Sequence, residues 1–420
     1  MGLFKKRKAA IERAKAEHIH EIVCLFCFQN FSHDLVLFRA VEAMDAEGYR
    51  AEVDHALDEY RYQFHMGTAG ELPVALNPGE FSEVSKGYVR GILSSLKDDY
   101  GKVSTSRLCP YCHNIIPPGA GFTPSTIISF VGASQAGKSV YLTSLIHTLK
   151  TVTSHNFDVF CTPITNEVGW RFKYDYEDPL IENGHLLDPT QKERLQEPLI
   201  FTFSFADSAK PEINIAFFDV AGEGMVDTGY MDIFAAHIRN SSGVMFLVDP
   251  QQFKAIGRKV QLMNHLDYDL SATSEPMEVL SGLVENYIHK QHSGISDIPT
   301  AMVLTKSDLL AAMSYDGGYL RQNSRIFSRY NHRGFLNLTE AEIIGYEVDD
   351  FIQIVDPNFR NALTRRFARL GLFAVSALGA HPDTVRQIVA NFSPVRVDEP
   401  FLWILYQLGF IDGYYESELK

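Results

Sequence analysis

The sequence has little cysteine, a deficit of positive charge and no long apolar run. Five cysteines in 420 residues are too few for a disulfide scaffold. With 38 Lys and Arg against 52 Asp and Glu, the formal net charge is −14, which argues against a protein that coats nucleic acid. The apolar stretch 401–410 has only half of the ~20 residues that a membrane-spanning helix requires. We therefore expect a cytoplasmic protein with no nucleic-acid partner and no transmembrane segment.

Apolar residues make up 45% of the chain, with 29 Phe, 19 Tyr and 2 Trp, so it can close hydrophobic cores. At about 150 residues per domain, the length predicts two to three domains. Residues 1–20 predict a basic helix, because the first 16 residues hold six cations and one anion. This helix lacks the apolar stretch of a secretory signal. It is either a solvated, partly frayed segment or an arm for an acidic partner or an anionic membrane surface.

Residues 125–412 alternate between short apolar strands and helical stretches, which is typical of a parallel α/β domain. Helices are expected at 139–150, 231–240, 276–291 and 357–370, and a last one begins near Asp398 and Pro400. Strands are expected at 127–131, 199–205, 213–218, 243–248, 301–304 and 372–375, the second and third as neighbours. We predict an α/β fold, a mostly parallel sheet flanked by helices.

Two CxxC pairs lie in the preceding segment, residues 21–118, which a turn-rich linker at 117–124 separates from the α/β domain. Four thiolates in two tight knuckles suit one structural Zn²⁺; redox dithiols and unrelated core cysteines are the alternatives. The predicted ligands are Cys24, Cys27, Cys109 and Cys112. The insert between the pairs, 28–108, is expected to contain a helical run over 35–56. His113 and Cys161 are interpreted as bystanders.

A phosphate-binding loop is predicted directly after the first α/β strand. Residues 132–139 fit GxxxxGK[ST] and lie between a strand and a helix, the context that such a loop requires. Its amides would point at phosphate oxygens, Lys138 would reach the β- and γ-phosphates, and the Ser139 hydroxyl would bind Mg²⁺. An ordinary glycine-rich turn is the alternative. The predicted binding residues are Gly132, Ala133, Ser134, Gln135, Ala136, Gly137, Lys138, Ser139 and Val140.

An acidic residue follows a later apolar strand. Asp219 could hold Mg²⁺ through water, as in other P-loop sites. Residues 219–222 also fit DxxG, in which the Gly222 N–H would sense the γ-phosphate. The alternative is a strand that ends in a capped turn.

A base-recognition motif is predicted at Thr305, Lys306 and Asp308, which fit [NT]KxD. The Asp308 carboxylate would accept from guanine N1–H and the exocyclic amine, while the stem of Lys306 lies over the purine ring. Adenine presents the opposite donor pattern and would leave that carboxylate unpaired. A helix cap at Ser307 or Asp308 is the alternative. The SA[KL] loop, whose backbone would contact guanine O6, is predicted at Ser376, Ala377 and Leu378.

In this order, the motifs resemble those of the translation-factor-like (TRAFAC) class of P-loop GTPases, over residues 125–395. With its zinc-ribbon-like front end and its C-terminal helix, the chain is also similar to the bacterial double-GTPase families. Those families are proposed components of NTP-dependent conflict or signalling systems. The intervals between the motifs exceed those of a minimal small GTPase, so inserted material is expected in each of them.

The resemblance implies a switch I threonine that reaches Mg²⁺ and the γ-phosphate. Thr190 is the first choice, and Thr162 and Thr165 are the alternatives. Glu223 stands where Ras-type GTPases carry a water-orienting glutamine, so it would either orient water or stabilise the following turn. No arginine is assignable as a charge-neutralising finger, which implies slow intrinsic hydrolysis.

The sequence therefore predicts a switch that binds GTP or GDP with Mg²⁺, hydrolyses GTP and carries a structural Zn²⁺. The catalytic set would be Lys138, Thr190, Gly222 and Glu223. A protein effector or a second GTPase is the expected partner. One alternative is an ATPase of another P-loop branch, in which residues 305–308 only cap a helix. The other is a non-enzymatic adaptor that holds the nucleotide as a static folding cofactor.

Overall fold

The chain forms two compact units, residues 1–126 with 209–216 and residues 127–208 with 217–420. The computed structural model describes residues 21–42, 51–64, 66–122, 125–133, 135–187, 197–207, 210, 212–219, 238–264, 275–286, 294–313, 320–321, 323–380 and 392–418. The boundaries expected at 20, 118 and 412 stay predictions. Within the described ranges, every helix is too short or too polar to cross a membrane.

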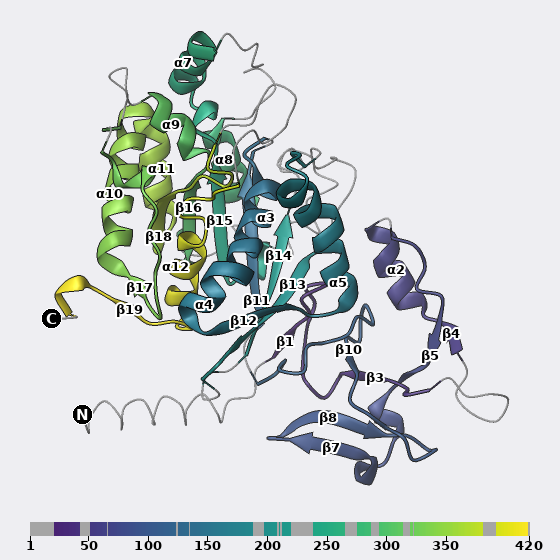
Figure 1. Ribbon diagram of the computed structural model, residues 1–420. Helices are drawn as coiled ribbons and strands as arrows, with labels where there is room; N and C mark the ends of the chain where they lie inside the picture. The colour runs from purple at the N-terminus through teal and green to yellow at the C-terminus, as the bar shows by residue number, and fades with distance from the viewer. Residues whose placement is uncertain are drawn as a thin grey trace. The chain divides into compact units, whose positions relative to one another are not determined.

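The first unit consists of short antiparallel strands and the helix α2 (His55–Gln63) (Figure 1). The pairs are β1 (Ile22–Val23) with β2 (Asn30–Phe31), and β4 (Ala51–Val53) with β5 (Glu71–Pro73). One three-stranded sheet has the order β10 (Arg107–Leu108), β3 (Leu37–Arg39), β6 (Ala75–Leu76). A second has the order β7 (Lys86–Val89), β8 (Ile92–Lys97), β9 (Val103–Ser104).

The helical run expected over 35–56 is wrong in its position. Strand β3 pairs on one side with β10 and on the other with β6, and β4 is also extended. These pairings with distant segments override the local helical pattern. Helix α2 starts only at His55, where the Asp54 side chain accepts a hydrogen bond from the Leu57 N–H (3.1 Å) and caps it.

A seven-stranded, mostly parallel sheet has most of its strands in the second unit. Its order is β12 (Val159–Pro163), β13 (Leu199–Phe205), β14 (Ile213–Asp219), β11 (Thr126–Gly132), β15 (Gly243–Val248), β16 (Thr300–Leu304) and β18 (Leu370–Ala374). The four neighbouring strands β11, β15, β16 and β18 run parallel. At the opposite edge, β12 pairs antiparallel with β13. The predicted α/β class and the predicted strands are confirmed, including β13 and β14 as neighbours. β12 was not predicted.

Helices lie against both faces of this sheet, because its central strands are apolar on both sides. In β15, Phe246 contacts Phe359 of α11 (Pro357–Arg366), with ring centroids 6.0 Å apart. Gly243 lies three residues earlier and so faces the other side, where a Cβ would sit 2.6 Å from Ile404 of α12 (Glu399–Gln407). The helices are α3 (Lys138–Thr148), α4 (Ser154–Phe157), α5 (Asn166–Arg171), α7 (Lys254–Asn264), α8 (Pro276–Asn286), α9 (Ser307–Met313), α10 (Leu338–Val355), α11 (Pro357–Arg366) and α12 (Glu399–Gln407).

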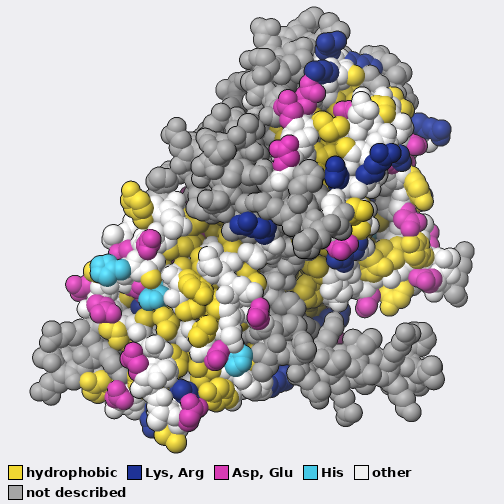
Figure 2. All heavy atoms as spheres, turned by 180° about the vertical axis from the view of Figure 1, so that it is seen from behind, with side chains coloured by type: hydrophobic (Ala, Val, Ile, Leu, Met, Phe, Trp, Pro, Cys, Tyr) yellow, Lys and Arg dark blue, Asp and Glu magenta, His cyan; other side chains and the backbone are white. Residues whose placement is uncertain are grey.

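Several helical segments differ from the expected ones. The helix after the phosphate-binding loop continues as a π-helical turn, η3 (Leu149–Thr153), and a second π-helical stretch, η4 (Phe172–Glu182), follows α5. Short 3-10 turns are η6 (Pro250–Gln252) and η10 (Arg325–Phe327), and a small parallel pair is formed by β17 (Leu336–Asn337) and β19 (Gly413–Tyr414). Most of the helix expected at 231–240 lies outside the described residues. Figure 2 shows acidic, basic and hydrophobic side chains interspersed over the described part of one face.

Candidate functional site

The predicted phosphate-binding loop connects β11 to α3. Positive φ angles at Gln135 (63°) and Gly137 (81°) curl the backbone between strand and helix. Gly132 is required at the strand end, because a Cβ there would lie 2.5 Å from the Leu247 carbonyl oxygen of β15. Ser134 lies outside the described residues. The loop therefore has the tight turn and the helix N-terminus that phosphate binding needs.

The Lys138 side chain lies over this loop. Its Nζ is buried and donates to the carbonyl oxygens of Gly132 (3.0 Å) and Ala133 (2.8 Å). The positive charge is thus held within the curl of the backbone. Ser139 and Val140 are half-buried in the first turn of α3. This arrangement brings the lysine and the helix N-terminus to one place, as the motif predicts.

The TKSD segment is bonded directly to the phosphate-binding loop. The Thr305 hydroxyl donates to the Ala136 carbonyl (3.0 Å), and Lys306 Nζ donates to the Gln135 carbonyl (3.1 Å). Lys306 also has a positive φ of 51°, which turns the chain sharply after β16. Segments that are 169 to 171 residues apart in the sequence therefore share one hydrogen-bonded wall.

The third segment of the site is the loop after β18. The Ser376 hydroxyl donates to Asp308 Oδ1 (2.6 Å) and accepts from the Gly379 N–H (2.9 Å). The Ala377 carbonyl accepts from Ser144 Oγ of α3 (2.8 Å), and the neighbouring Leu378 is buried. One oxygen of Asp308 is thereby fixed, and the loop is held to the helix that begins at Lys138.

Asp249 belongs to this site but was missed by sequence reasoning. It follows β15, and its Oδ2 lies 2.5 Å from Lys306 Nζ, with the carboxylate side chain fully buried. Its Oδ1 accepts from the Gln251 N–H (2.9 Å) and caps η6. The available signal was an acidic residue directly after a buried parallel strand, at the sheet edge where ligands bind in such folds.

The predicted magnesium and switch residues are placed only in part. β14 ends at Asp219, as expected. Thr190, Gly222 and Glu223 lie outside the described residues. Of the alternatives for Thr190, Thr165 caps α5 by accepting from the Val168 N–H (3.3 Å), and Thr162 lies in β12.

The four predicted zinc ligands come together in the first unit. Their sulfur atoms all lie within 4.8 Å of one another, and the Cys24–Cys112 and Cys27–Cys109 Sγ pairs are 3.7 Å apart. Tetrahedral Zn²⁺ with bonds of about 2.3 Å requires sulfur separations of about 3.8 Å. The donor set fits that ion. No other cluster of metal-ligating side chains is found among the described residues.

The two cysteine knuckles have the same backbone form. In each, the residue after the second cysteine has a positive φ, Phe28 at 59° and His113 at 52°. Its N–H donates to the carbonyl of the first cysteine, at 2.9 Å from Cys24 and 3.0 Å from Cys109. This repeated turn directs both sulfurs of each pair to the same side.

His113, which follows the last cysteine of the cluster, contacts the insert 28–108 through Asp54. Its Nδ1 lies 2.7 Å from Asp54 Oδ1, and Arg39 lies 2.6 Å from the other oxygen. Burial opposes ionisation of Asp54, but hydrogen bonds from Arg39, the Leu57 amide and His113 hold the pKa of this carboxyl below its ordinary value. Burial raises the pKa of the Cys161 thiol to about 12, which favours the protonated thiol over the thiolate.

Comparisons with known proteins give one curated relative and several solved structures. A putative ESX-1 scaffolding and assembly protein, SaeC, from Mycolicibacterium smegmatis is 26% identical over 330 residues, 72% of this chain and 80% of the relative. The Arl6 small GTPase of Trypanosoma brucei with bound GppNp is 11% identical, with 68% of this chain and 98% of that chain covered and a TM-score of 0.28. The GTP-bound Ski7 GTPase-like domain of S. cerevisiae is 13% identical, with 68% and 50% covered and a TM-score of 0.31.

These two TM-scores are too low to support an argument. The family comparison is stronger, because the model of the Double-GTPase 2 family matches residues 126–362, more than half of the chain. This match covers the phosphate-binding loop, the strand that ends at Asp219 and the TKSD segment. The chain belongs to the Double-GTPase 2 family.

Proposed function

We propose that the protein is a Mg²⁺-dependent switch that binds GTP and GDP and hydrolyses GTP slowly. The observation that carries this proposal is the set of hydrogen bonds that joins the segments 132–139, 305–308 and 376–378, which lie far apart in the sequence. Lys306 and Thr305 reach the phosphate-binding loop, and Ser376 holds Asp308. A helix cap alone would not need any of these contacts.

Each residue would act by binding or positioning. Lys138 and the loop amides would hold the phosphates. Asp308 would select guanine by accepting hydrogen bonds from the N1–H and the exocyclic amine of the base. Ser139, Asp219 and Thr190 would hold Mg²⁺, whose charge would offset the charge that develops on the transferred phosphoryl group. Gly222 would sense the γ-phosphate, and Glu223 would orient the attacking water.

The output of the switch is proposed to be association with a protein partner in the cytoplasm. Support for this comes from the relative in Mycolicibacterium smegmatis, which is described as a putative scaffolding and assembly protein of ESX-1. The zinc-stapled first unit would be a folded module that carries such contacts. The basic segment 1–20, which lies outside the described residues, stays a possible electrostatic arm in this proposal.

Nucleotide titrations of the purified protein test the proposal. GDP is expected to bind far more tightly than ADP, and Asp308→Asn to weaken GDP binding by about tenfold to a hundredfold, because one charged acceptor is lost. Asp349→Asn is the control, because it breaks an ion pair with Arg360 on α10 and α11, away from this site. Equal GDP and ADP binding that is unaffected by Asp308→Asn would favour an ATPase. A hydrolysis assay tests the second alternative: if the protein incubated with GTP forms no GDP above background, with or without a partner, it would be a static adaptor.

The Asp249–Lys306 pair gives a second prediction. Asp249→Ala is expected to weaken GDP binding by about tenfold and to lower Tm, because Lys306 loses its buried counter-charge and its fixed place beside the phosphate-binding loop. Asp249→Asn keeps an acceptor for the Gln251 amide and isolates the charge effect. Both are measured by titration and thermal melting. A loss of Tm with unchanged GDP affinity would contradict a role for Asp249 in the site.

A further inference from the structure

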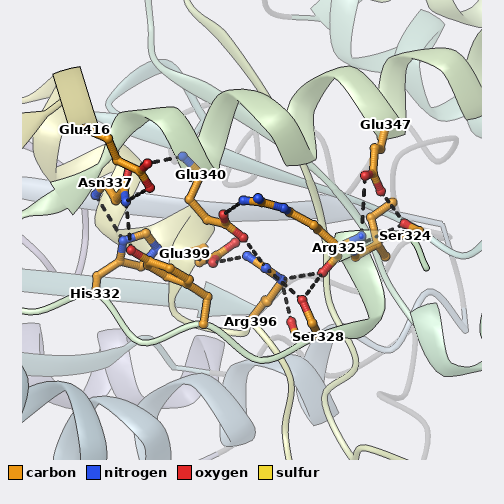
Figure 3. A network of polar contacts seen from close by, with 12 residues as sticks. Ser324, Arg325, Ser328, His332, Asn337, Glu340, Glu347, Arg396, Glu399 and Glu416 are labelled. Atoms are coloured by element: carbon orange, nitrogen blue, oxygen red, sulfur yellow. Dashed lines mark hydrogen bonds and ion pairs between the residues drawn. The ribbon is translucent and has the colours of Figure 1, made fainter.

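A buried ion network lies in the second unit beside the C-terminal helix α12 (Figure 3). At its centre is Arg396, whose guanidinium is fully buried. One terminal nitrogen donates to Glu340 of α10 and the other to Glu399 of α12, each at 2.5 Å. These are the first turns of two separate helices, so one side chain joins both helix N-termini.

The same guanidinium also holds a third segment. Its Nε donates to the carbonyl oxygens of Ser328 (2.8 Å) and Arg325 (3.1 Å). Arg325 in turn pairs with the second oxygen of Glu340 (2.5 Å). Two arginines therefore balance two glutamates, and the network carries no net charge from these four groups.

His332 completes the network as a neutral group. Its Nδ1 accepts from the Asn337 N–H (3.1 Å), so the proton of the neutral ring is on Nε2, which donates to Glu399 (3.2 Å). Figure 3 shows His332 and Arg396 both directed toward Glu399. All these partners come from the segment 324–340 and from the segment 396–399.

Immediately before Arg396, the backbone is paired with the loop predicted to contact guanine. The Ser376 N–H donates to the Val395 carbonyl (3.1 Å), and the Val395 N–H donates to the Ser376 carbonyl (2.8 Å). Two residues earlier, the Ser393 N–H donates to the Leu378 carbonyl (3.1 Å). Arg329, from the segment that Arg396 holds, donates to the Ser393 carbonyl (3.2 Å).

The fit between this loop and residues 393–395 is tight. Gly379 has a φ of 81°, and a Cβ on it would lie 2.1 Å from the Ser393 carbonyl oxygen. Arg396 itself has a φ of 56°, a region that non-glycine residues adopt only where their surroundings hold them there. A displacement of Arg396 would therefore be passed through Val395 to Ser376.

Ser376 connects this segment to the residue proposed to bind guanine, because its hydroxyl donates to Asp308 Oδ1 at 2.6 Å. We propose that Arg396 is a positioning residue for guanine recognition, fixing the 393–395 segment and so the Ser376–Asp308 contact. A buried ion network of this kind adds little net stability over a hydrophobic one but can impose a single geometry. The proposal rests on the proposed guanine-nucleotide binding.

The test compares GDP with IDP, which lacks the exocyclic amine that Asp308 would accept from. The ratio of the IDP Kd to the GDP Kd reports this contact and is expected to be about tenfold or more in the wild type. Arg396→Lys keeps the charge but loses the forked geometry, so the ratio is expected to fall by about threefold to tenfold. Arg329→Ala, which removes only the contact to Ser393, should lower it by less.

Arg360→Lys is the matched control, because Arg360 makes a two-bonded pair with Asp349 of α10 and is not part of the network around Arg396. Its ratio should equal that of the wild type. A folded Arg396→Lys variant with an unchanged ratio, or with GDP and IDP weakened equally, overturns the proposal. If Arg396→Lys does not fold, an unchanged ratio in Arg329→Ala overturns it instead. A wild-type ratio near one overturns both this inference and the proposed guanine selectivity.

Discussion

Lys138→Ala is expected to weaken GDP and GTP binding by about a hundredfold or more. The Lys138 ammonium is buried inside the phosphate-binding loop, 2.8 and 3.0 Å from two loop carbonyls. A charged group in such a place contributes strongly to phosphate binding, since removing one partner of a desolvated charge pair costs 2–5 kcal/mol or more. Isothermal titration or fluorescence titration with GDP and GTP measures the loss.

The control for Lys138 is Lys173→Ala. Lys173 lies on η4 and pairs with Asp178 at 2.6 Å on the surface, so its removal changes the net charge equally without touching the loop. Its nucleotide affinity should match that of the wild type. If Lys138→Ala binds GDP as tightly as the wild type while remaining folded, the loop at 132–139 is not the phosphate site. Equal weakening in both variants would indicate a general charge effect.

The parts of the site that the sequence predicts are those encoded by local pattern. Each motif follows a short apolar strand, and parallel strands place their carboxyl ends at one edge of a sheet. Residues 132–139, 305–308 and 376–378 therefore converge, and the short apolar runs that predict the strands are enough to predict this convergence. Hydrogen bonds between these segments follow from that convergence, as the contact of Thr305 with Ala136 illustrates.

Other features depend on partners that lie far away in the chain. Asp249 gains its role only because Lys306, 57 residues later, reaches it, and the contacts of Arg396 span 56 and 68 residues. A helix was expected over 35–56 because β3 and β4 are only three residues long and pair with β10, β6 and β5, which lie further along the chain. Helix α10 was not predicted, although Ile344, Val348, Phe351 and Ile352 lie at helical spacing and are buried in the structure.

The second large effect is expected at the cysteine cluster. Cys109→Ser should remove about one equivalent of Zn²⁺ and unfold the first unit, because the knuckles join strands that are too short to be stable alone. Zinc binding in small domains contributes about 10–16 kcal/mol of apparent free energy, comparable with or greater than the stability of a whole domain. Elemental analysis measures the metal, and limited proteolysis within residues 28–108 measures the unfolding.

Cys161→Ser is the matched control, because Cys161 lies outside the cluster of four cysteines. This variant should keep the zinc and the protease resistance of the wild type. Treating the wild type with a strong chelator should reproduce the Cys109→Ser result, since the ligands are then present but the ion is not. A wild type that contains no metal yet resists proteolysis within 28–108 would show that packing alone holds the cysteines 3.7 Å apart. Both knuckles share the same turn and bring four sulfurs within 4.8 Å of one another, which is the arrangement expected if a bound ion holds the two ends of the insert together.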